Sequence, residues 1–245
     1  MIKKIITSIL VMFVVLVVKA QDDHMITGYA PEFVGQKVIL YTYSDYITLT
    51  RVKVDETIVG EDSLFKLKNN INVTIKAIIE IEKTEAEIYL QPKSDYFIEY
   101  YKPTNGPITF ANQKVEVLFY GLDSTDVNYR ILLYNQLFDQ FISVNQLNII
   151  RHGFKPYLDT FKIYVYDAYK EVESPYFINY VRYNIALMEQ INVNSNAENS
   201  KANVYLEYIH PYPVYSNNDQ YMQFVKAYYP KHFEGYLPRI KSAVY

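Results

Sequence analysis

The stretch Ile71-Asn72-Val73-Thr74-Ile75-Lys76-Ala77-Ile78-Ile79-Glu80-Ile81 decides the fold of the first half of the chain. Its odd-numbered residues are all apolar, and its even-numbered residues are mostly polar. Successive side chains of a β-strand point to opposite faces of the sheet, so a period of two is typical of a strand with one buried face. The stretch therefore predicts a half-buried strand.

Segments of similar composition lie on both sides of this strand. The candidates are Met25–Tyr29, Lys37–Tyr43, Thr48–Val54, Leu64–Leu67, Ala86–Leu90, Tyr96–Tyr101 and Lys114–Tyr120. Turn-forming residues separate them, for example Gly60-Glu61-Asp62 and Gln91-Pro92. Short strands at roughly ten-residue spacing, with no helix between them, predict an antiparallel β-sandwich over residues 21–120.

After Gly121 the spacing of the apolar residues becomes helical. One apolar face recurs at intervals of four and three residues: Val127, Ile131, Tyr134, Phe138 and Phe141. Asp123 or Ser124 is a plausible N-cap for this helix because its side chain can accept a hydrogen bond from a free backbone N–H.

Four more helices are expected after this one. The second begins near Pro156 and buries Leu158, Phe161, Val165, Ala168 and Val172. The third has Ser174 as N-cap and Pro175 at its first position, and it buries Phe177, Val181, Ile185 and Met188. A short helix covers about 201–209, and the last, capped by Asn217 or Asn218, runs to about Tyr229. The predicted class is α+β, with an all-helical module at 121–245 after the β module.

The first twenty residues have the pattern of a secretory signal peptide. Lys3 and Lys4 precede an apolar run from Ile5 to Val18, and Ala20 ends a possible cleavage site. A membrane anchor that is not cleaved is the alternative, although a span normally needs about 20 apolar residues. The pattern predicts export to the periplasm or cell envelope of a Gram-negative bacterium. No later apolar run is long enough to predict a membrane span after cleavage.

Composition narrows the classes of function. Cleavage would leave 225 of the 245 residues, enough for one large domain or two small ones. Without Lys3, Lys4 and Lys19, the 24 basic residues fall to 21 against 27 acidic ones, a net charge of −6. This acidic balance, without a basic cluster, argues against nucleic acid as a partner.

No catalytic motif stands out in the sequence. It has no cysteine, so neither disulfides nor thiol chemistry is expected. The four histidines (His24, His152, His210 and His232) are not at metal-ligand spacing, and no serine elbow or phosphate-binding loop occurs. Glu80 and Glu82 alternate on the outer face of one strand, where solvated charge is expected. A hydrolase with a pair of catalytic carboxylates ranks last among the hypotheses. We therefore expect no catalytic residue, no metal site and no cofactor. We also expect that the chain is not an enzyme.

Tyrosine is the most distinctive feature of the C-terminal part. The chain has 27 tyrosines and 13 phenylalanines but no tryptophan. Six tyrosines are candidates for a ligand site or an interface: Tyr205, Tyr208, Tyr212, Tyr215, Tyr221 and Tyr228. Such a set can line a groove for a peptide or a sugar, but it is more often the packing surface of short helices.

Several segments together resemble a known family. They are Ile26-Thr27-Gly28, Gly35-Gln36-Lys37-Val38-Ile39-Leu40-Tyr41, Asp62-Ser63-Leu64-Phe65-Lys66-Leu67, and Ala86-Glu87-Ile88-Tyr89-Leu90-Gln91-Pro92 followed by Asp95-Tyr96-Phe97-Ile98. The helical segments are Tyr176-Phe177 with Tyr180, Tyr183 and Ala186, and Tyr215-Ser216-Asn217 with Tyr221, Met222 and Phe224. From about residue 26 to 236, the chain resembles the N-terminal β-domain and helical region of Bacteroidetes TlpA-like thiol–disulfide oxidoreductases.

The chain departs from this family in two ways. Asp62-Ser63-Leu64-Phe65 replaces the family's common Asp-x-x-Gly turn, and the Cys-x-x-Cys of the thioredoxin domain is absent. The resemblance implies a non-catalytic accessory or binding module, either truncated or a standalone paralogue, whose partner is a redox domain or another envelope protein. The alternative is an envelope protein that binds peptide or glycan through its sandwich or its tyrosine-rich helices.

Overall fold

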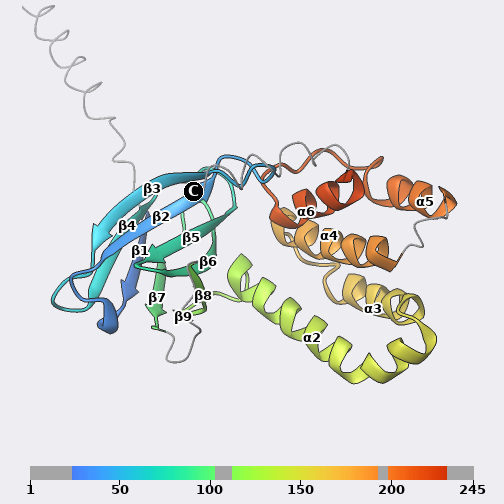
Figure 1. Ribbon diagram of the computed structural model, residues 1–245, viewed down its shortest axis with the longest axis horizontal. Helices are drawn as coiled ribbons and strands as arrows, with labels where there is room; N and C mark the ends of the chain where they lie inside the picture. Colours follow the sequence, from blue (N-terminus) through green and yellow to red (C-terminus); the bar gives the residue numbers. More distant parts are fainter. Residues whose placement is uncertain (1–23, 103–111, 193–197, 231–245) are drawn as a thin grey trace, which may run out of the picture.

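The computed structural model describes residues 24–102, 112–192 and 198–230. The fold is α+β, with two β-sheets at one end of the molecule and five α-helices of the described ranges at the other (Figure 1). The predicted signal peptide lies outside the described residues. None of the helices within those ranges is long and apolar enough to cross a membrane.

The strands form one sheet of four strands and one of five. Their bounds are β1 His24–Tyr29, β2 Lys37–Tyr43, β3 Arg51–Ile58, β4 Leu64–Asn69, β5 Ile75–Ile81, β6 Thr84–Leu90, β7 Tyr96–Tyr100, β8 Gln113–Val115 and β9 Val117–Tyr120. The strand orders are β4-β1-β7-β9 and β3-β2-β5-β6-β8.

Both sheets are mixed, so the expectation of purely antiparallel strands is wrong. β1 pairs with β7 in parallel, and β6 pairs with β8 in parallel. The connection from β6 passes through β7, which belongs to the other sheet, before the chain returns to β8. This excursion supplies the long crossover that two parallel neighbours require.

A single hydrophobic cluster draws side chains from both sheets. Ile26 and Ile98 of the four-stranded sheet and Leu40 and Ile79 of the five-stranded sheet are all fully buried in it. Phe65 lies across Gly28, where a Cβ atom would be 2.0 Å from its ring. Glycine at residue 28 therefore makes room for an aromatic side chain of the neighbouring strand.

Two strands begin later than the sequence pattern predicts. β3 begins at Arg51 because Asp45 holds the preceding loop: its carboxylate accepts hydrogen bonds from the backbone N–H groups of Ile47 and Thr48. β5 begins at Ile75, not Ile71. Side-chain capture of backbone donors competes with strand pairing, and apolar alternation does not report it.

The helices follow the predicted order. Their bounds are α2 Val127–His152, α3 Lys155–Ala168, α4 Pro175–Asn192, α5 Glu198–Tyr208 and α6 Asp219–Tyr228. Asp126 caps α2, rather than Asp123 or Ser124, because the Asp123 carboxylate accepts from the N–H and hydroxyl of Thr125. Asn218 caps α6, as one of the two predicted candidates.

The first turn of α2 is attached to the edge of β6. Asn128 Oδ1 accepts a hydrogen bond from the backbone N–H of Tyr89 at 2.7 Å, and its Nδ2 donates to the Tyr89 carbonyl at 2.7 Å. The Tyr89 ring contacts the rings of Tyr176 and Tyr180 on α4. The helices thus pack against the sheets as well as against one another.

Candidate functional site

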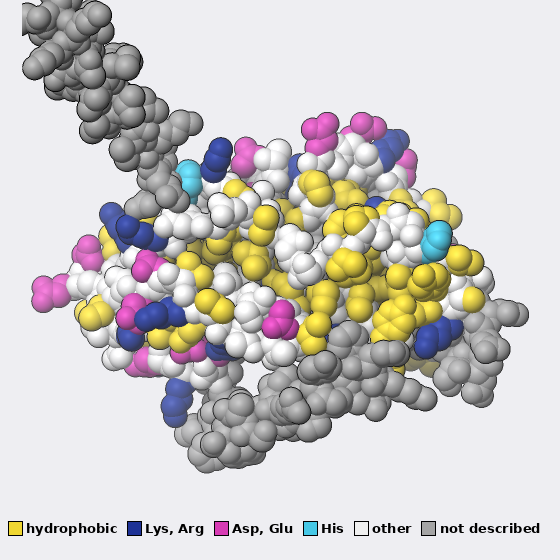
Figure 2. All heavy atoms as spheres, turned by 90° about the horizontal axis from the view of Figure 1, so that it is seen from above, with side chains coloured by type: hydrophobic (Ala, Val, Ile, Leu, Met, Phe, Trp, Pro, Cys, Tyr) yellow, Lys and Arg dark blue, Asp and Glu magenta, His cyan; other side chains and the backbone are white. Residues whose placement is uncertain are grey.

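A cavity of about 420 Å³ lies in the helical half of the molecule. Its walls come from the end of α3 and the turn after it, from α4, and from the end of α5 with the segment that follows. The lining residues are Tyr166, Tyr169, Lys170, Val172, Ile178, Val181, Arg182, Glu207, Tyr208 and Tyr212. Figure 2 shows hydrophobic side chains, tyrosine included, gathered over the helical half on one face of the molecule.

Arg182 is fixed on one wall of the cavity. The centre of its guanidinium lies 4.0 Å from the centroid of the Tyr212 ring, a cation–π contact. Its Nη1 donates a hydrogen bond of 2.6 Å to Oδ1 of Asn179, one turn earlier on α4. These two contacts hold the plane of the guanidinium, so its orientation is set before any ligand arrives.

Lys162 lies beside the cavity in a cluster of opposite charge. Its Nζ is 2.9 Å from Glu189 Oε1 and donates to the Tyr208 hydroxyl at 2.7 Å, and Glu207 is a further partner. Burial alone would lower the pKa of Lys162, but its hydrogen bonds to Glu189 and Glu207 outweigh burial and raise that pKa. The ammonium therefore stays charged and is neutralised within the protein.

Burial raises the pKa of two phenols of the cavity, which are neutral at neutral pH even without this shift. It raises the pKa of the Tyr208 hydroxyl, and the nearby charges of Glu189 and Glu207 act in the same direction. Burial also raises the pKa of Tyr166, although the positive charges of Lys162 and Arg182 partly oppose it. At neutral pH both side chains offer a hydroxyl group and an aromatic ring.

Two of the six predicted tyrosines lie at this cavity. Tyr208 is 1% exposed and forms part of its wall, and Tyr212 carries the stacked arginine. Tyr205 is 37% exposed on α5, beside His210 and away from the cavity lining.

The other three predicted tyrosines pack in the hydrophobic cluster around α6. Tyr221 contacts Tyr183 and Tyr215 ring to ring, and Tyr228 packs against Phe224. The structure therefore brings Tyr208 and Tyr212 together at one cavity and leaves Tyr215, Tyr221 and Tyr228 as packing residues.

Sequence reasoning missed Tyr166, Tyr169 and Arg182. Tyr166 lies off the apolar face predicted for α3, so helical periodicity did not point to it. Tyr169 comes four residues after Val165 and packs against the helical core, a position that periodicity assigns to packing and not to a site. Arg182 follows the buried Val181 in the sequence. It comes three residues after Asn179, so the two side chains lie on neighbouring turns of the helix, and this spacing was the signal that could have indicated their contact.

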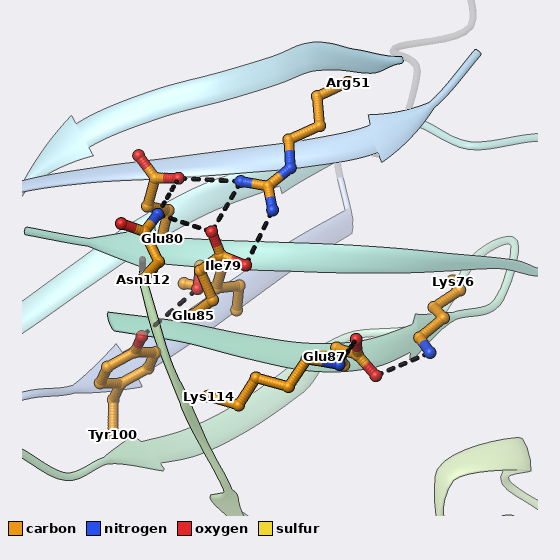
Figure 3. A network of polar contacts seen from close by, with 9 residues as sticks. All are labelled: Arg51, Lys76, Ile79, Glu80, Glu85, Glu87, Tyr100, Asn112 and Lys114. Atoms are coloured by element: carbon orange, nitrogen blue, oxygen red, sulfur yellow. Dashed lines mark hydrogen bonds and ion pairs between the residues drawn. The ribbon is translucent and has the colours of Figure 1, made fainter. Parts of the chain in front are cut away.

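The outward face of the five-stranded sheet carries a paired network of charges (Figure 3). Arg51 on β3 makes two hydrogen bonds of 2.8 Å to the Glu85 carboxylate, and its Nη1 is 3.0 Å from Glu80 Oε2. Asn112 donates to both carboxylates. Glu80 is thus held by partners outside its own strand, and it is not a solvated charge as the sequence suggested.

The two carboxyl groups of this network have pKa values shifted in opposite directions. Burial raises the pKa of Glu80. Burial would also raise that of Glu85, but the hydrogen bonds from Arg51 and Asn112 outweigh it and lower that pKa. Such a split suits an acid and a base, yet neither glutamate lines the cavity, and their partners tie β3, β5 and β6 together.

A second buried network joins the sheets to α6. Lys76 on β5, 14% exposed, lies 3.4 Å from Asp219, 3% exposed, and 2.6 Å from Glu87. The hydroxyls of Tyr89 and Tyr176 donate to the Asp219 carboxylate at 3.3 and 3.2 Å. Asp219 also occupies the first turn of α6, where the helix dipole favours a negative charge.

The three histidines that the structure describes lie apart from one another. His24 lies 3.6 Å from Asp95, His152 ends α2 and His210 is exposed, whereas His232 lies outside the described residues. Within residues 24–102, 112–192 and 198–230, no three His, Asp or Glu side chains are grouped so that they could hold a metal ion.

Comparisons with known proteins add no relative to this picture. No protein-family model matches the sequence, and neither a curated protein nor a solved structure matches it.

Proposed function

We propose that this chain is an exported, non-catalytic binding module, with its two sheets arranged as a sandwich and its ligand site in the helical half. The observation that carries the binding role is the cavity in which Arg182 is stacked on Tyr212 among further tyrosines. A concave site with apolar walls and a few oriented polar groups is the usual form of a small-molecule or peptide site.

The resemblance to TlpA-like oxidoreductases gives this module a context. In that family a thioredoxin domain carries the redox cysteines, whereas this chain has none. The proposed role is therefore to bind a ligand or a partner protein for such machinery in the periplasm or envelope, without performing thiol chemistry. Mass spectrometry of the protein from the envelope fraction tests export, with Gln21 expected as the first residue.

A thermal-shift screen of the purified chain tests the binding site. Peptides, oligosaccharides and small organic acids are added at millimolar concentration, and a ligand that binds the folded state raises the Tm. Tyr212→Ala should remove most of the shift, whereas Tyr205→Ala, an exposed tyrosine outside the cavity lining, should leave it unchanged. No shift with any ligand class, or equal effects of the two variants, would contradict a site in this cavity.

A second candidate function is glycan binding on the outward face of the four-stranded sheet. Phe97 on β7 and Tyr120 on β9 are paired across the strands, with ring centroids 5.4 Å apart, and both rings are exposed. The Tyr120 hydroxyl donates a hydrogen bond to the Glu99 carboxylate. Tyr29 and Leu118 are also exposed. An exposed pair of aromatic rings beside hydroxyl and carboxylate groups suits the C–H faces and hydroxyls of sugar rings.

Affinity electrophoresis through gels that contain neutral polysaccharides tests this second function. The native chain should be retarded by a bound polymer, and the double variant Phe97→Ala, Tyr120→Ala should migrate freely. Tyr164→Ala on α3, which also removes an exposed aromatic ring, is the matched control. Retardation that survives the double variant would remove this face from consideration.

A further inference from the structure

Among the cationic side chains that line or border the cavity, Arg182 differs from the two lysines in its described partners. Lys162 is paired with Glu189 and Glu207, and Lys170 lies 3.0 Å from Asp167. Arg182, in contrast, makes no ion pair with any carboxylate of the described residues, and its acceptor there is the neutral amide of Asn179. Within the described residues, the guanidinium therefore lacks a carboxylate partner.

The chemistry of the guanidinium also suits a planar anion. Arginine has five N–H donors in a fixed fork, and Asn179 accepts from one nitrogen. Stacking on Tyr212 fixes the plane of the fork. A fork held in this way binds a carboxylate through two parallel hydrogen bonds, at little further cost in side-chain entropy.

The rest of the lining is suited to an apolar group beside that anion. Val172, Ile178 and Val181 contribute aliphatic surface, and Tyr166 and Tyr169 contribute aromatic surface. Glu207 lies on the same lining, and Lys162 has both Glu189 and Glu207 as partners, so that cluster keeps one excess negative charge. This excess disfavours a ligand with two negative charges, such as a phosphate dianion.

We propose that the cavity recognises an organic carboxylate attached to an apolar or aromatic group, with Arg182 as the residue that binds the carboxylate. This inference rests on the proposed function and names the ligand class of the same site. A free peptide C-terminus and a small aromatic acid both present this chemistry, and the experiment separates them.

Isothermal titration calorimetry with matched acids and amides tests the inference on the full chain. The probes are N-acetyl-phenylalanine and its amide, and the tripeptide Ala-Ala-Phe with a free or an amidated C-terminus. We expect each amide to bind about tenfold or more weakly than its acid, because a charge-assisted pair is lost. Tighter binding of the tripeptide acid identifies a peptide terminus as the source, and the reverse order identifies a small acid.

The variant Arg182→Gln should lower the affinity for both acids to that of the amides and leave amide binding unchanged. Tyr166→Phe, which keeps the ring but removes a hydroxyl of the same cavity, should preserve the preference for acids. The comparison of acid and amide needs no variant, so it remains decisive if Arg182→Gln fails to fold.

Two negative results have different meanings. Equal affinity for acid and amide, abolished in both by Tyr212→Ala, would overturn the carboxylate preference and leave the proposed binding function standing. Binding of none of the four probes, together with a thermal shift from another ligand class, would also overturn the inference alone. Binding of no ligand of any class would overturn the proposed function as well.

Discussion

Replacement of Asp219 by alanine should weaken the packing of α6 against the sheets at a buried polar contact. Asp219 is 3% exposed and has three partners: the ammonium of Lys76 and the hydroxyls of Tyr89 and Tyr176. The variant leaves both hydroxyls without their acceptor. It also leaves Lys76 with Glu87 at 2.6 Å as its remaining carboxylate partner.

The expected loss of stability follows from these contacts. An unsatisfied buried hydroxyl costs about 1–3 kcal/mol. Removal of one member of a buried ion pair costs about 3–5 kcal/mol, and here the Glu87 contact reduces that effect. We therefore expect the free energy of unfolding to fall by about 3–5 kcal/mol in total. This is a large share of the roughly 5–15 kcal/mol typical of a folded domain.

Urea unfolding followed by far-UV circular dichroism measures this change. Asp159→Ala is the matched control, because Asp159 forms an exposed i,i+4 pair with Lys155 and should cost no more than about 0.5 kcal/mol. In the double variant Lys76→Met, Asp219→Leu, apolar packing should restore much of the stability lost. A loss below about 1 kcal/mol for Asp219→Ala, or one equal to the control, would refute the reasoning that this contact is buried and coupled.

Three further predictions concern other parts of the chain. Gly28→Ala should destabilise the chain by about 2 kcal/mol or more in the same urea assay, because its Cβ would meet the Phe65 ring at 2.0 Å; full stability would contradict that contact. Burial would raise the pKa of Glu87, but the charge of Lys76 and the hydrogen bonds from Lys114 and Lys76 outweigh burial and lower that pKa. The stability that Glu87 contributes is therefore present above pH 4.5 and is lost as the pH falls through the lowered pKa. Glu87→Gln should therefore be less stable than the native chain at pH 7, with a gap that narrows in urea titrations at pH 3; a constant gap would argue against the shift. Asn218→Ala removes the N-cap of α6 and should lower the free energy of unfolding by about 1–2 kcal/mol, measured by thermal melting, and an unchanged Tm would show that the cap is dispensable.

The sequence predicted the strands and helices of this fold better than it predicted which strands pair and in which direction. The alternation in Ile75–Ile81 and the period of Val127, Ile131 and Tyr134 are local signals, and the structure confirms a strand and a helix there. The parallel pairing of β6 with β8 could not be predicted, because strand direction depends on a crossover through the other sheet.

The candidate site was predictable only in part, for a related reason. Tyr208 and Tyr212 are close together in the sequence and were selected by composition alone. Tyr166 and Arg182 reach the same cavity from α3 and α4, and no single segment reveals that approach. The pairing of Lys76 with Asp219 likewise joins residues that are 143 positions apart, and neither breaks the local pattern in a way that indicates a partner.

The contact between Asn128 and Tyr89 has a consequence for self-association. β8 pairs with β6 only from Thr84 to Ala86, so the remainder of that edge would expose backbone donors and acceptors to a strand from another molecule. The Asn128 side chain forms hydrogen bonds with both the backbone N–H and the carbonyl of Tyr89, and α2 lies where an incoming strand would pair. The amide thus blocks edge-to-edge pairing with a strand of another molecule at this position.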